Sequence, residues 1–504
     1  MVMAVTLAVL GAACHEPTPD SATAPSSTTT VTSTVGTSPS ASERAATTVG
    51  STSPAAEGFE PAPVSWKSCS PSGYQCGSVE VPLDYGEPNG PRISLGIKRK
   101  PAGDPNSRIG SLFFNPGGPG ASGVESLPGA VSRLSDPVKE RFDVVAWDPR
   151  GVGESAPIRC DSSVVALYEK DLDEQHPSPD VEQASKAVAD ECASRSGDLL
   201  AHVGTIDTAR DLDSLRKAVA DDKLNYLGVS YGTLIGLVYA EMYPANIRAM
   251  IIDGVVDPTL DPYEANLDQS KAVDRAIGQF VEWCKKRSSC PLKPDPAGAL
   301  DELQAEADAG RVAGTIQGED VKLSPTLTSL AVITATYDEA SWPTLAQAVR
   351  RALDGDGSAV AMIADSYLGE ASLGANNAIN CIDAPKPTQR EIDDLLAKAQ
   401  KEAPRVGLFN ANAGRVCEHW QAEPKPIDRN LEVNGSAPIM VWGTTGDNAT
   451  PYDNAVHVAS LLPGSRLVTL DANRHAAIGE NACVNRIFSS YLVDLDLPPS
   501  GTRC

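Results

Sequence analysis

A short strand, a Gly-x-Ser-x-Gly turn and a helix follow one another in the middle of the chain. The apolar run Leu224–Val229 leads into GVSYG at residues 228–232, and TLIGLVYAEMYP after it carries apolar residues at helical spacing. Glycine at both ends of the motif permits a tight turn, because side chains there would meet the strand and the helix. The turn would place the hydroxyl of Ser230 at a helix N-terminus, where developing negative charge is stabilised. Ser230 is therefore the predicted nucleophile, and the alternative is a serine in an ordinary strand-to-helix turn.

The chain from Ser111 onward alternates short apolar runs with helical patterns. This order predicts an α/β fold, with a mostly parallel sheet and helices on both faces. The predicted strands are Ser111–Phe114, Phe142–Trp147, Leu224–Val229, Ala249–Val255, Ile439–Trp442 and Leu467–Leu470. Because open α/β sheets bind ligands at the carboxyl ends of their strands, the residues after each run are where chemistry is expected.

A serine nucleophile needs a base and an acid that orients the base, and two later loops offer them. Asp447 follows an apolar run at 438–442, in the segment GTTGDNATP. His475 follows the next predicted strand, in DANRHAAIG, and a helix from Pro451 to Leu462 fits between the two residues. All three groups would lie at one edge of the sheet, which predicts Ser230, Asp447 and His475 as nucleophile, acid and base.

The other histidines and a second aspartate are weaker candidates. Four histidines lie before the serine turn or in a predicted insertion: His15, His176, His202 and His419. His457 lies within the predicted helix 451–462, where packing or solvent contact is expected. Asp471 is an alternative acid, but it shares a loop with His475. Thr450 is predicted to cap that helix at its N-terminus rather than to act in catalysis.

The glycine-rich segment Asn115–Gly120, NPGGPG, follows the predicted strand SLFF. Acyl transfer needs two backbone N–H donors for the developing oxyanion, and the residue after the nucleophile, Tyr231, supplies one. Gly118 is the predicted second donor, and Gly117 is the alternative. Such loops also cradle phosphates, but no Gly-Lys-Ser/Thr sequence follows this one.

Four segments together resemble one family of enzymes. They are NPGGPG at 115–120, DPRGVGES at 148–155, GVSYGT with the helix after it, and GTTGDNATP at 443–451. The set is similar to α/β-hydrolase peptidases that include prolyl aminopeptidases, secreted tripeptidyl aminopeptidases of Streptomyces and mycobacterial envelope lipoprotein serine proteases. The resemblance covers residues 63–504 and implies the α/β-hydrolase fold, the triad above, and peptide or protein substrates cleaved near a free N-terminus. It implies no metal and no organic cofactor.

The segment between Ser230 and Asp447 is longer than the remaining core requires. It predicts a large, mainly helical cap at residues 257–432. Two apolar stripes at helical spacing fit the core of such a cap: Val273, Ala276, Ile277, Phe280, Val281 and Cys284, and then Ile392, Leu395, Leu396 and Ala399. A cap of this kind can close one end of the cleft.

An enzyme that acts at a free N-terminus also needs a carboxylate to pair with the α-ammonium group of its substrate. The segment NAINCID at 377–383 offers Asp383, on a loop that Cys381 would pin. Asp383 is therefore the candidate substrate-binding residue, and an exposed loop aspartate is the alternative.

The first residues resemble an export signal. Met1–Ala13 is apolar apart from Thr6 and too short to span a bilayer, and Cys14 follows it as in a lipoprotein signal. A plain secretory signal is the alternative. Of the 40 residues Pro17–Ala56, 25 are Ser, Thr or Pro and none is aromatic, which predicts an extended tether. The expected organisation is a signal peptide at 1–13, a lipid-anchored tether at 14–62, core at 63–256, cap at 257–432 and core at 433–504.

The cysteines agree with export. Apart from Cys14 there are ten, an even number that fits five disulfides in an oxidising compartment. Nearest-neighbour spacing predicts the pairs Cys69–Cys76, Cys160–Cys192, Cys284–Cys290, Cys381–Cys417 and Cys483–Cys504. A metal cluster is the competing use, but the sequence has no Cys-x-x-Cys and no paired His-Cys spacing. The protein is expected in the cell envelope as a lipoprotein, or secreted, with the lipid as its contact with the membrane.

The net charge of −24 argues against nucleic-acid binding by release of counterions from phosphates. Three functions stay open: a peptidase acting near a free N-terminus, a carboxylesterase, lipase or endoprotease with the same triad, and a lipoprotein that keeps the fold without catalysis. An intact Ser, Asp and His in this order argues against the third. The sequence leaves side-chain preference and oligomeric state undetermined.

Overall fold

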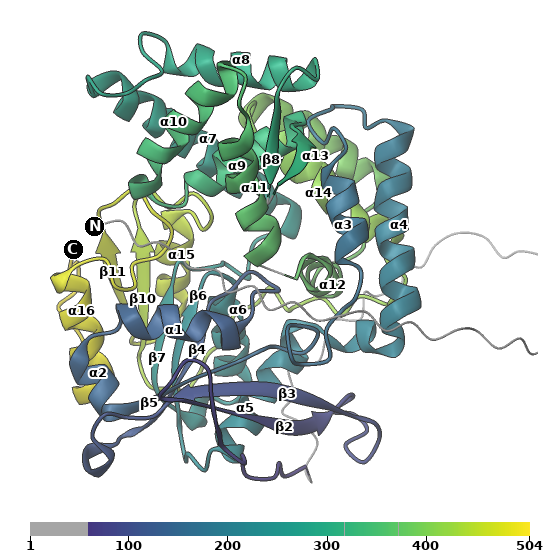
Figure 1. Ribbon diagram of the computed structural model, residues 1–504. Helices are drawn as coiled ribbons and strands as arrows, with labels where there is room; N and C mark the ends of the chain where they lie inside the picture. The colour runs from purple at the N-terminus through teal and green to yellow at the C-terminus, as the bar shows by residue number, and fades with distance from the viewer. Residues whose placement is uncertain (1–58, 317, 371) are drawn as a thin grey trace, which may run out of the picture. The chain divides into compact units, whose positions relative to one another are not determined.

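The computed structural model describes residues 59–504 apart from Gln317 and Ala371 (Figure 1). The predicted signal Met1–Ala13, the predicted lipid anchor Cys14 and nearly all of the predicted tether lie outside the described residues. In the described part, no helix combines the length and the apolar character needed to cross a bilayer.

A nine-stranded sheet forms the centre of the described chain (Figure 1). Its spatial order is β1-β2-β3-β5-β4-β6-β7-β10-β11. The strands are β1 (Lys67–Cys69), β2 (Tyr74–Pro82), β3 (Arg92–Lys100), β4 (Gly110–Asn115), β5 (Phe142–Trp147), β6 (Leu224–Val229), β7 (Ile247–Asp253), β10 (Ile439–Thr444) and β11 (Arg466–Leu470). From β5 to β11 all neighbouring strands run parallel, so the predicted α/β fold with a mostly parallel sheet is confirmed.

All six predicted strands are present, and three antiparallel strands at one edge, β1 to β3, were not predicted. The segment of β3 contains a glycine and ends in the basic run Lys98–Lys100, so it lacks the continuous apolar run of a buried strand. The glycine is Gly96, and a Cβ added to it would lie 2.7 Å from the Cβ of Glu154. A glycine inside a strand here marks close approach of another segment.

Helices cover both faces of the sheet. They are α1 (Gly123–Arg133), α2 (Asp136–Arg141), α5 (Thr205–Ala218), α6 (Tyr231–Met242), α15 (Tyr452–Leu461) and α16 (Ala482–Ser489). Alternate residues of β5 divide between two cores: Val145 and Trp147 pack with α5, α6 and α15, while Val144 and Ala146 pack with α1, α2 and α16. This is the period of two that a strand buried on both faces requires.

The range predicted for the cap holds helices and one hairpin. They are α7 (Pro262–Lys286), α8 (Pro296–Asp308), β8 (Ala313–Ile316), β9 (Glu319–Lys322), α9 (Pro325–Ala335), α10 (Trp342–Leu353), α11 (Ser358–Glu370), α12 (Leu373–Asp383), α13 (Gln389–Glu402) and α14 (Gly407–Ala413). Both predicted apolar stripes are buried, one in α7 and the other in α13.

Two helices that precede the serine turn also pack against the cap. They are α3 (Asp161–Tyr168) and α4 (Pro179–Ser196), which lie beside α13 and α14 in Figure 1. The Nδ2 atom of Asn412 donates to the carbonyl oxygen of Leu172, between α3 and α4, over 2.8 Å. Arg415 of the cap pairs with Glu182 of α4 over 2.6 Å. Residues 161–196 thus pack against the range predicted for the cap, although the two segments are far apart in the sequence.

The ten cysteines form the five pairs that nearest-neighbour spacing predicts: Cys69–Cys76, Cys160–Cys192, Cys284–Cys290, Cys381–Cys417 and Cys483–Cys504. Two of them join elements that border the site described below. Cys160–Cys192 joins the start of α3 to α4, and Cys381–Cys417 joins α12 to the following cap segment.

Candidate active site

Ser230 lies on a strained turn between β6 and α6. Its φ of 56° and ψ of −127° are rare for a residue with a side chain, and its N–H donates to the Asp253 carbonyl oxygen over 3.0 Å. A Cβ on Gly228 would lie 2.3 Å from the carbonyl oxygen of Gly232. The glycines are therefore required for the reason predicted, and the serine stands at the N-terminus of α6.

Asp447 and His475 form a hydrogen-bonded pair on the loops after β10 and β11. The Nδ1 atom of His475 lies 2.9 and 3.0 Å from the two carboxylate oxygens of Asp447. Burial lowers the pKa of His475, while the charge and hydrogen bonds of Asp447 raise it, and the net shift is upward. A carboxylate bonded to Nδ1 fixes the tautomer in which Nε2 is free to accept a proton.

Strand β7 connects this pair to the serine turn. Asp253 ends β7 and accepts the N–H of Ser230, and Gly254 follows it. A Cβ on Gly254, which has a φ of 70°, would lie 3.0 Å from the Cε1 atom of His475. The imidazole therefore packs against the backbone beside the nucleophile.

The rival acid and the rival base are engaged elsewhere. The exposed carboxylate of Asp471 accepts a hydrogen bond from Nε of Arg503 over 2.9 Å. Nδ1 of the half-exposed His457 lies 2.6 Å from Oδ2 of Asp257, which is buried. The geometry thus favours Asp447 and His475 over both alternatives.

Thr450 does not cap the helix, which corrects the prediction. Helix α15 begins at Tyr452, and Pro451 stands at its N-cap position. The Oγ1 atom of Thr450 lies 3.1 Å from Oδ2 of Asp447 and 3.4 Å from Nδ1 of His475, and its N–H donates to Oδ1 of Asp447. The backbone N–H and the hydroxyl of Thr450 thus both bond to the Asp447 carboxylate and help to position it.

Sequence reasoning missed the role of Asp253. Its carboxylate is fully buried and accepts the backbone N–H groups of Ala477 and Ile478 over 2.8 to 2.9 Å. Burial raises the pKa of Asp253 to about 6. An aspartate in the otherwise apolar run at 249–255 was the available signal, since a charge at the carboxyl end of a parallel strand is costly unless it has partners. Asp253 fixes the loop that carries His475.

A cap residue also contacts the histidine. The backbone N–H of His475 donates to the carbonyl oxygen of Tyr337 over 2.9 Å. The two rings meet edge to face, with centroids 5.4 Å apart. Tyr337 follows α9, more than a hundred residues before His475, so no local pattern could have predicted this contact.

The glycine-rich loop lies directly on the serine turn. A Cβ on Gly117 would lie 2.5 Å from the carbonyl oxygen of Val229 and 2.8 Å from the Cβ of Ser230. The N–H of Gly117 donates to Oδ1 of Asn115 over 3.0 Å, so it is already engaged. Gly118 and Tyr231 line the same cavity as Ser230. This arrangement favours Gly118 over Gly117 as the second oxyanion donor.

A cavity of about 470 Å³ opens above Ser230, within the usual range for small-molecule sites. Core and cap both line it, and the cap side is largely apolar and aromatic. Cap residues on its wall include Tyr263, Leu330, Ile333, Tyr337, Tyr367, Phe409 and Asp383.

Asp383 lies on the cavity wall, but not on a loop as predicted. It is the last residue of helix α12 and is half-buried. Its Oδ1 accepts the N–H of Thr205 over 2.8 Å, and its Oδ2 accepts the Thr205 hydroxyl over 2.5 Å. Burial raises the pKa of Asp383 to about 7, and the carboxylate of Asp207 also contributes to the increase. A cation beside Asp383 would offset this cost, which makes the residue suited to an ammonium group.

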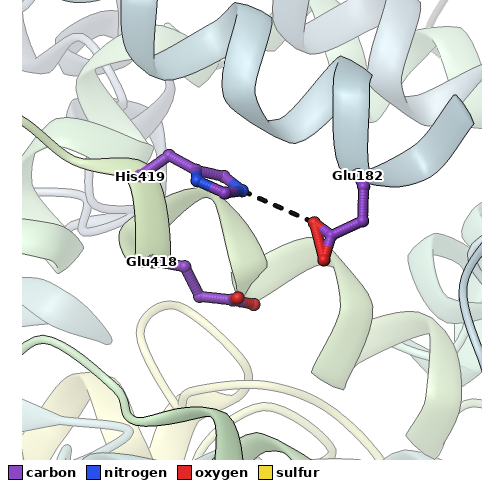
Figure 2. A group of neighbouring side chains, drawn as sticks. All are labelled: Glu182, Glu418 and His419. Carbon is purple, nitrogen blue, oxygen red and sulfur yellow. Dashed lines mark hydrogen bonds and ion pairs between the residues drawn. The ribbon is translucent and has the colours of Figure 1, made fainter. Parts of the chain in front are cut away.

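One cluster of the described residues has the composition of a metal site. Glu182, Glu418 and His419 turn toward one another from α4 and the segment after α14 (Figure 2). Arg415, whose side chain is 3% exposed, pairs with Glu182 over 2.6 Å and with Glu418 over 3.1 Å. Because this guanidinium already pairs with both carboxylates, the cluster joins α4 to the cap, and a cation bound there would meet the positive charge of Arg415.

Comparisons with known proteins identify a fold family and relatives that cover most of the chain. The model of the alpha/beta hydrolase fold family matches residues 110–482. Serine protease Hip1 of Mycobacterium tuberculosis is 37% identical over 482 residues, covering 88% of this chain and 91% of that protein. Tripeptidyl aminopeptidase of Streptomyces lividans is 32% identical, covering 86% and 84%. Carboxylesterase B of Mycobacterium tuberculosis is 32% identical, covering 87% and 89%.

The family match includes β4, the serine turn, and the loops of Asp447 and His475. The sheet order, the strained serine and the hydrogen-bonded Asp–His pair are independent of that match and agree with it. The chain therefore belongs to the α/β-hydrolase fold family.

Proposed function

We propose that this protein is an exported serine peptidase that cleaves peptides near a free N-terminus through an acyl-enzyme. Ser230 is the nucleophile, His475 the base and Asp447 the acid. Gly118 and Tyr231 supply the oxyanion donors. The likeness to a serine protease and a tripeptidyl aminopeptidase, each over most of the chain, supports peptide chemistry.

Each residue has one task in this mechanism. Nε2 of His475 takes the proton of the Ser230 hydroxyl as its oxygen attacks the scissile carbonyl carbon. The negative charge on the carbonyl oxygen is stabilised by two backbone N–H groups at the start of α6 and in the glycine-rich loop. The imidazolium, held by Asp447, then protonates the leaving amine. Water attacks the acyl-enzyme with His475 again as base, which releases the short N-terminal peptide and restores Ser230.

The observation that carries the preference for a free N-terminus is the place of Asp383. Its carboxylate lines the cavity that contains Ser230, and burial makes its ionised form costly. Pairing with the α-ammonium group of a substrate would recover that cost, whereas an N-acylated substrate would leave the carboxylate uncompensated. The cap, proposed at residues 257–432, would close the cavity beyond this point.

Export is part of the proposal. Five disulfides join all the cysteines of the described residues, and such bonds persist in oxidising compartments. The N-terminal segment with Cys14 would then supply either a lipid anchor in the cell envelope or a cleaved secretion signal.

A carboxylesterase is the second candidate, because one relative of comparable coverage carries the name Carboxylesterase B. The same triad cleaves esters and amides, so the catalytic residues do not distinguish the two. An endoprotease would need a cavity open at both ends.

Digestion of an unblocked decapeptide and its N-acetylated form tests the proposal, with the products identified by mass spectrometry. Short N-terminal fragments released only from the unblocked peptide, and absent with Ser230→Ala, are the expected result. Internal cleavage of both peptides would indicate an endoprotease. Hydrolysis of p-nitrophenyl esters without any peptide cleavage would indicate an esterase. A fluorophosphonate that fails to label Ser230 would exclude catalysis by this residue.

A further inference from the structure

One cap helix, α12, bonds to the loop after Gly118 and is connected through Thr205 to Tyr231. At its start, the N–H of Ser372 donates to the carbonyl oxygen of Gly120 over 3.0 Å. One turn later, Nδ2 of Asn376 donates to the carbonyl oxygen of Pro119 over 2.8 Å. The approach is close, because a Cβ on Gly120 would lie 2.5 Å from the carbonyl oxygen of Ser372. The cap thus bonds directly to the residues that follow Gly118.

The other end of α12 reaches the second donor. The Thr205 hydroxyl lies 2.5 Å from the Asp383 carboxylate and 2.6 Å from the phenol oxygen of Tyr231. An ionised carboxylate only accepts hydrogen bonds, so Thr205 donates to Asp383 and accepts from Tyr231. The side chain of the residue that supplies the second oxyanion N–H is therefore tied to the end of the same helix.

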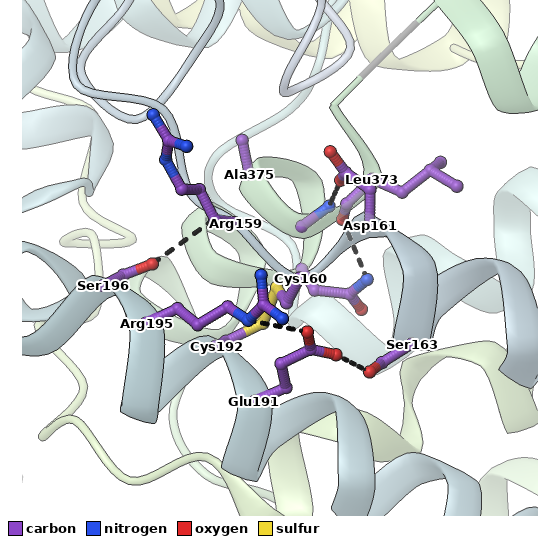
Figure 3. The surroundings of a disulfide bond; sticks show 12 residues. Arg159, Cys160, Asp161, Ser163, Glu191, Cys192, Arg195, Ser196, Leu373 and Ala375 are labelled. Atoms are coloured by element: carbon purple, nitrogen blue, oxygen red, sulfur yellow. Dashed lines mark hydrogen bonds and ion pairs between the residues drawn. A yellow bond between two sulfur atoms is a disulfide. The ribbon is translucent and has the colours of Figure 1, made fainter. Parts of the chain in front are cut away.

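Disulfides hold α12 in this position. Cys381, in its last turn, is bonded to Cys417. Its first turn lies beside the Cys160–Cys192 bond, and Figure 3 shows Leu373 and Ala375 among the residues around that bond. A Cβ on Gly374 would lie 2.7 Å from Sγ of Cys160, and its N–H donates to Oδ1 of Asp161 over 2.5 Å. The helix is a fixed support.

The glycine-rich loop needs such a support. Gly117, Gly118 and Gly120 all have φ values between 95° and 106°, and glycine has the greatest backbone freedom of any residue. An oxyanion donor lowers the barrier only when it is aimed in advance at the position of the developing charge. On the core side Asn115 bonds the loop, and on the cap side Asn376 does so.

We propose that Asn376 is a positioning residue of the oxyanion hole: through the Pro119 carbonyl it fixes the loop that presents the Gly118 N–H. The cap is then part of the machinery that stabilises the transition state, in addition to closing the cavity. This inference rests on the proposed function in one respect, the assignment of Gly118 as an oxyanion donor. It does not depend on peptide specificity.

The test compares Asn376→Ala with Ile379→Val, a variant at a buried position of the same helix that does not bond the loop. Direct loss of an oxyanion donor costs about 100-fold to 1,000-fold in kcat, so loss of a support one step away should cost about tenfold. We expect Asn376→Ala to lower kcat about tenfold with KM within about twofold, for p-nitrophenyl acetate and for an unblocked chromogenic peptide. Ile379→Val should lower Tm while its kcat stays at the wild-type value.

A peptidyl trifluoromethyl ketone separates positioning from a general structural effect, because it forms an oxyanion adduct with the serine. Asn376→Ala should weaken its binding by the same factor as kcat, while inhibition by the product tripeptide stays unchanged. Equal weakening of ketone and product, or an unchanged kcat, would overturn the inference. The ester assay keeps the two proposals apart. If the enzyme shows no preference for free N-termini, the proposed function is contradicted, but the effect of Asn376→Ala on ester hydrolysis can still be measured.

Discussion

The carboxylate of Asp383, at the end of cap helix α12, accepts both the backbone N–H and the hydroxyl of Thr205, the first residue of core helix α5. The negative group of one helix thus meets the positive end of another, which stabilises its charge in part. Burial still raises the pKa of Asp383 to about 7. The residue joins cap to core and also faces the substrate cavity. Kinetics and a thermal melt are therefore both needed to separate its effect on substrate binding from its effect on folding.

Replacement of Asp383 by Asn should raise KM for free-amine peptides by about tenfold or more and leave N-blocked esters within about twofold, because a charge-assisted bond of about 1.5–3 kcal/mol is lost. Steady-state kinetics on both substrates measure this. Equal rises in KM would mean that the variant disturbs the cavity in general. A thermal melt at pH 8 is the control: Asn keeps one oxygen for the Thr205 N–H but turns a donor toward the Thr205 hydroxyl, so a small fall in Tm is expected and is recorded separately from the change in KM.

The preference for a free amine should vary with pH. The ratio of kcat/KM for unblocked to blocked substrate should rise as pH passes about 7, the pKa of Asp383, because only the ionised carboxylate attracts the ammonium group. It should fall again above pH ~8, where the peptide α-amino group loses its proton. The profile of this ratio in Asp383→Asn should lose the rise near neutrality; a rise that persists would assign it to another group.

Asp447→Asn should lower kcat about 10⁴-fold, as in the general serine protease template, because His475 loses the partner that fixes its tautomer. The acid limb of the remaining activity should also move to lower pH. The Asp447 charge and hydrogen bonds raise the pKa of His475, and the neutral imidazole is the active base. A pH–rate profile of purified variant and wild type checks both parts. An acid limb at unchanged pH would assign that limb to another residue.

Asp253→Asn should also move the acid limb to lower pH, by less than Asp447→Asn. The Asp253 charge contributes to the raised pKa of His475 from the end of β7. An asparagine would also turn a donor toward the N–H groups of Ala477 and Ile478, so a destabilisation of about 1–3 kcal/mol is expected. Chemical denaturation measures the second effect. A limb that moves to higher pH would contradict the proposed electrostatics.

The disulfides should differ in their contribution to stability. Cys160 and Cys192 are 32 residues apart, and Cys284 and Cys290 only 6. The chain-entropy model then gives about 3.7 kcal/mol for the first bond and about 2.2 kcal/mol for the second. Double Cys→Ala variants compared by reversible denaturation test this order. The reverse order would show that native-state contacts outweigh chain entropy.

The sequence was sufficient for the parts of the site that local patterns encode. Ser230 was identified because its glycines and the flanking strand and helix lie within twenty residues. Asp447 and His475 followed because the carboxyl ends of parallel strands meet at one edge. Each of these predictions used a strand, the loop after it and the chain order, none of which requires knowledge of distant contacts.

The cap-to-core contacts could not be predicted in this way. Asn376, Tyr337 and Thr205 contact the site through partners that are distant in the sequence, and no periodicity marks them. Thr450 was misassigned because Thr-Pro before a helical pattern is typical of an N-cap. The buried Asp447 carboxylate competed more strongly for its hydroxyl. The N-cap preference was outweighed by a carboxylate only three residues earlier in the chain, which accepts both the N–H and the hydroxyl of Thr450.

Ser230 is proposed to cleave peptides that carry a free N-terminus. The most direct measurement is kcat/KM for an Ala-Ala-Pro-Ala chromogenic peptide in free-amine and N-succinylated forms, with wild type and Ser230→Ala. The expected result is a preference for the free amine of about tenfold or more, from one charge-assisted contact, and loss of all activity in the variant. Equal or faster cleavage of the succinylated form, or activity that survives in Ser230→Ala, would contradict it.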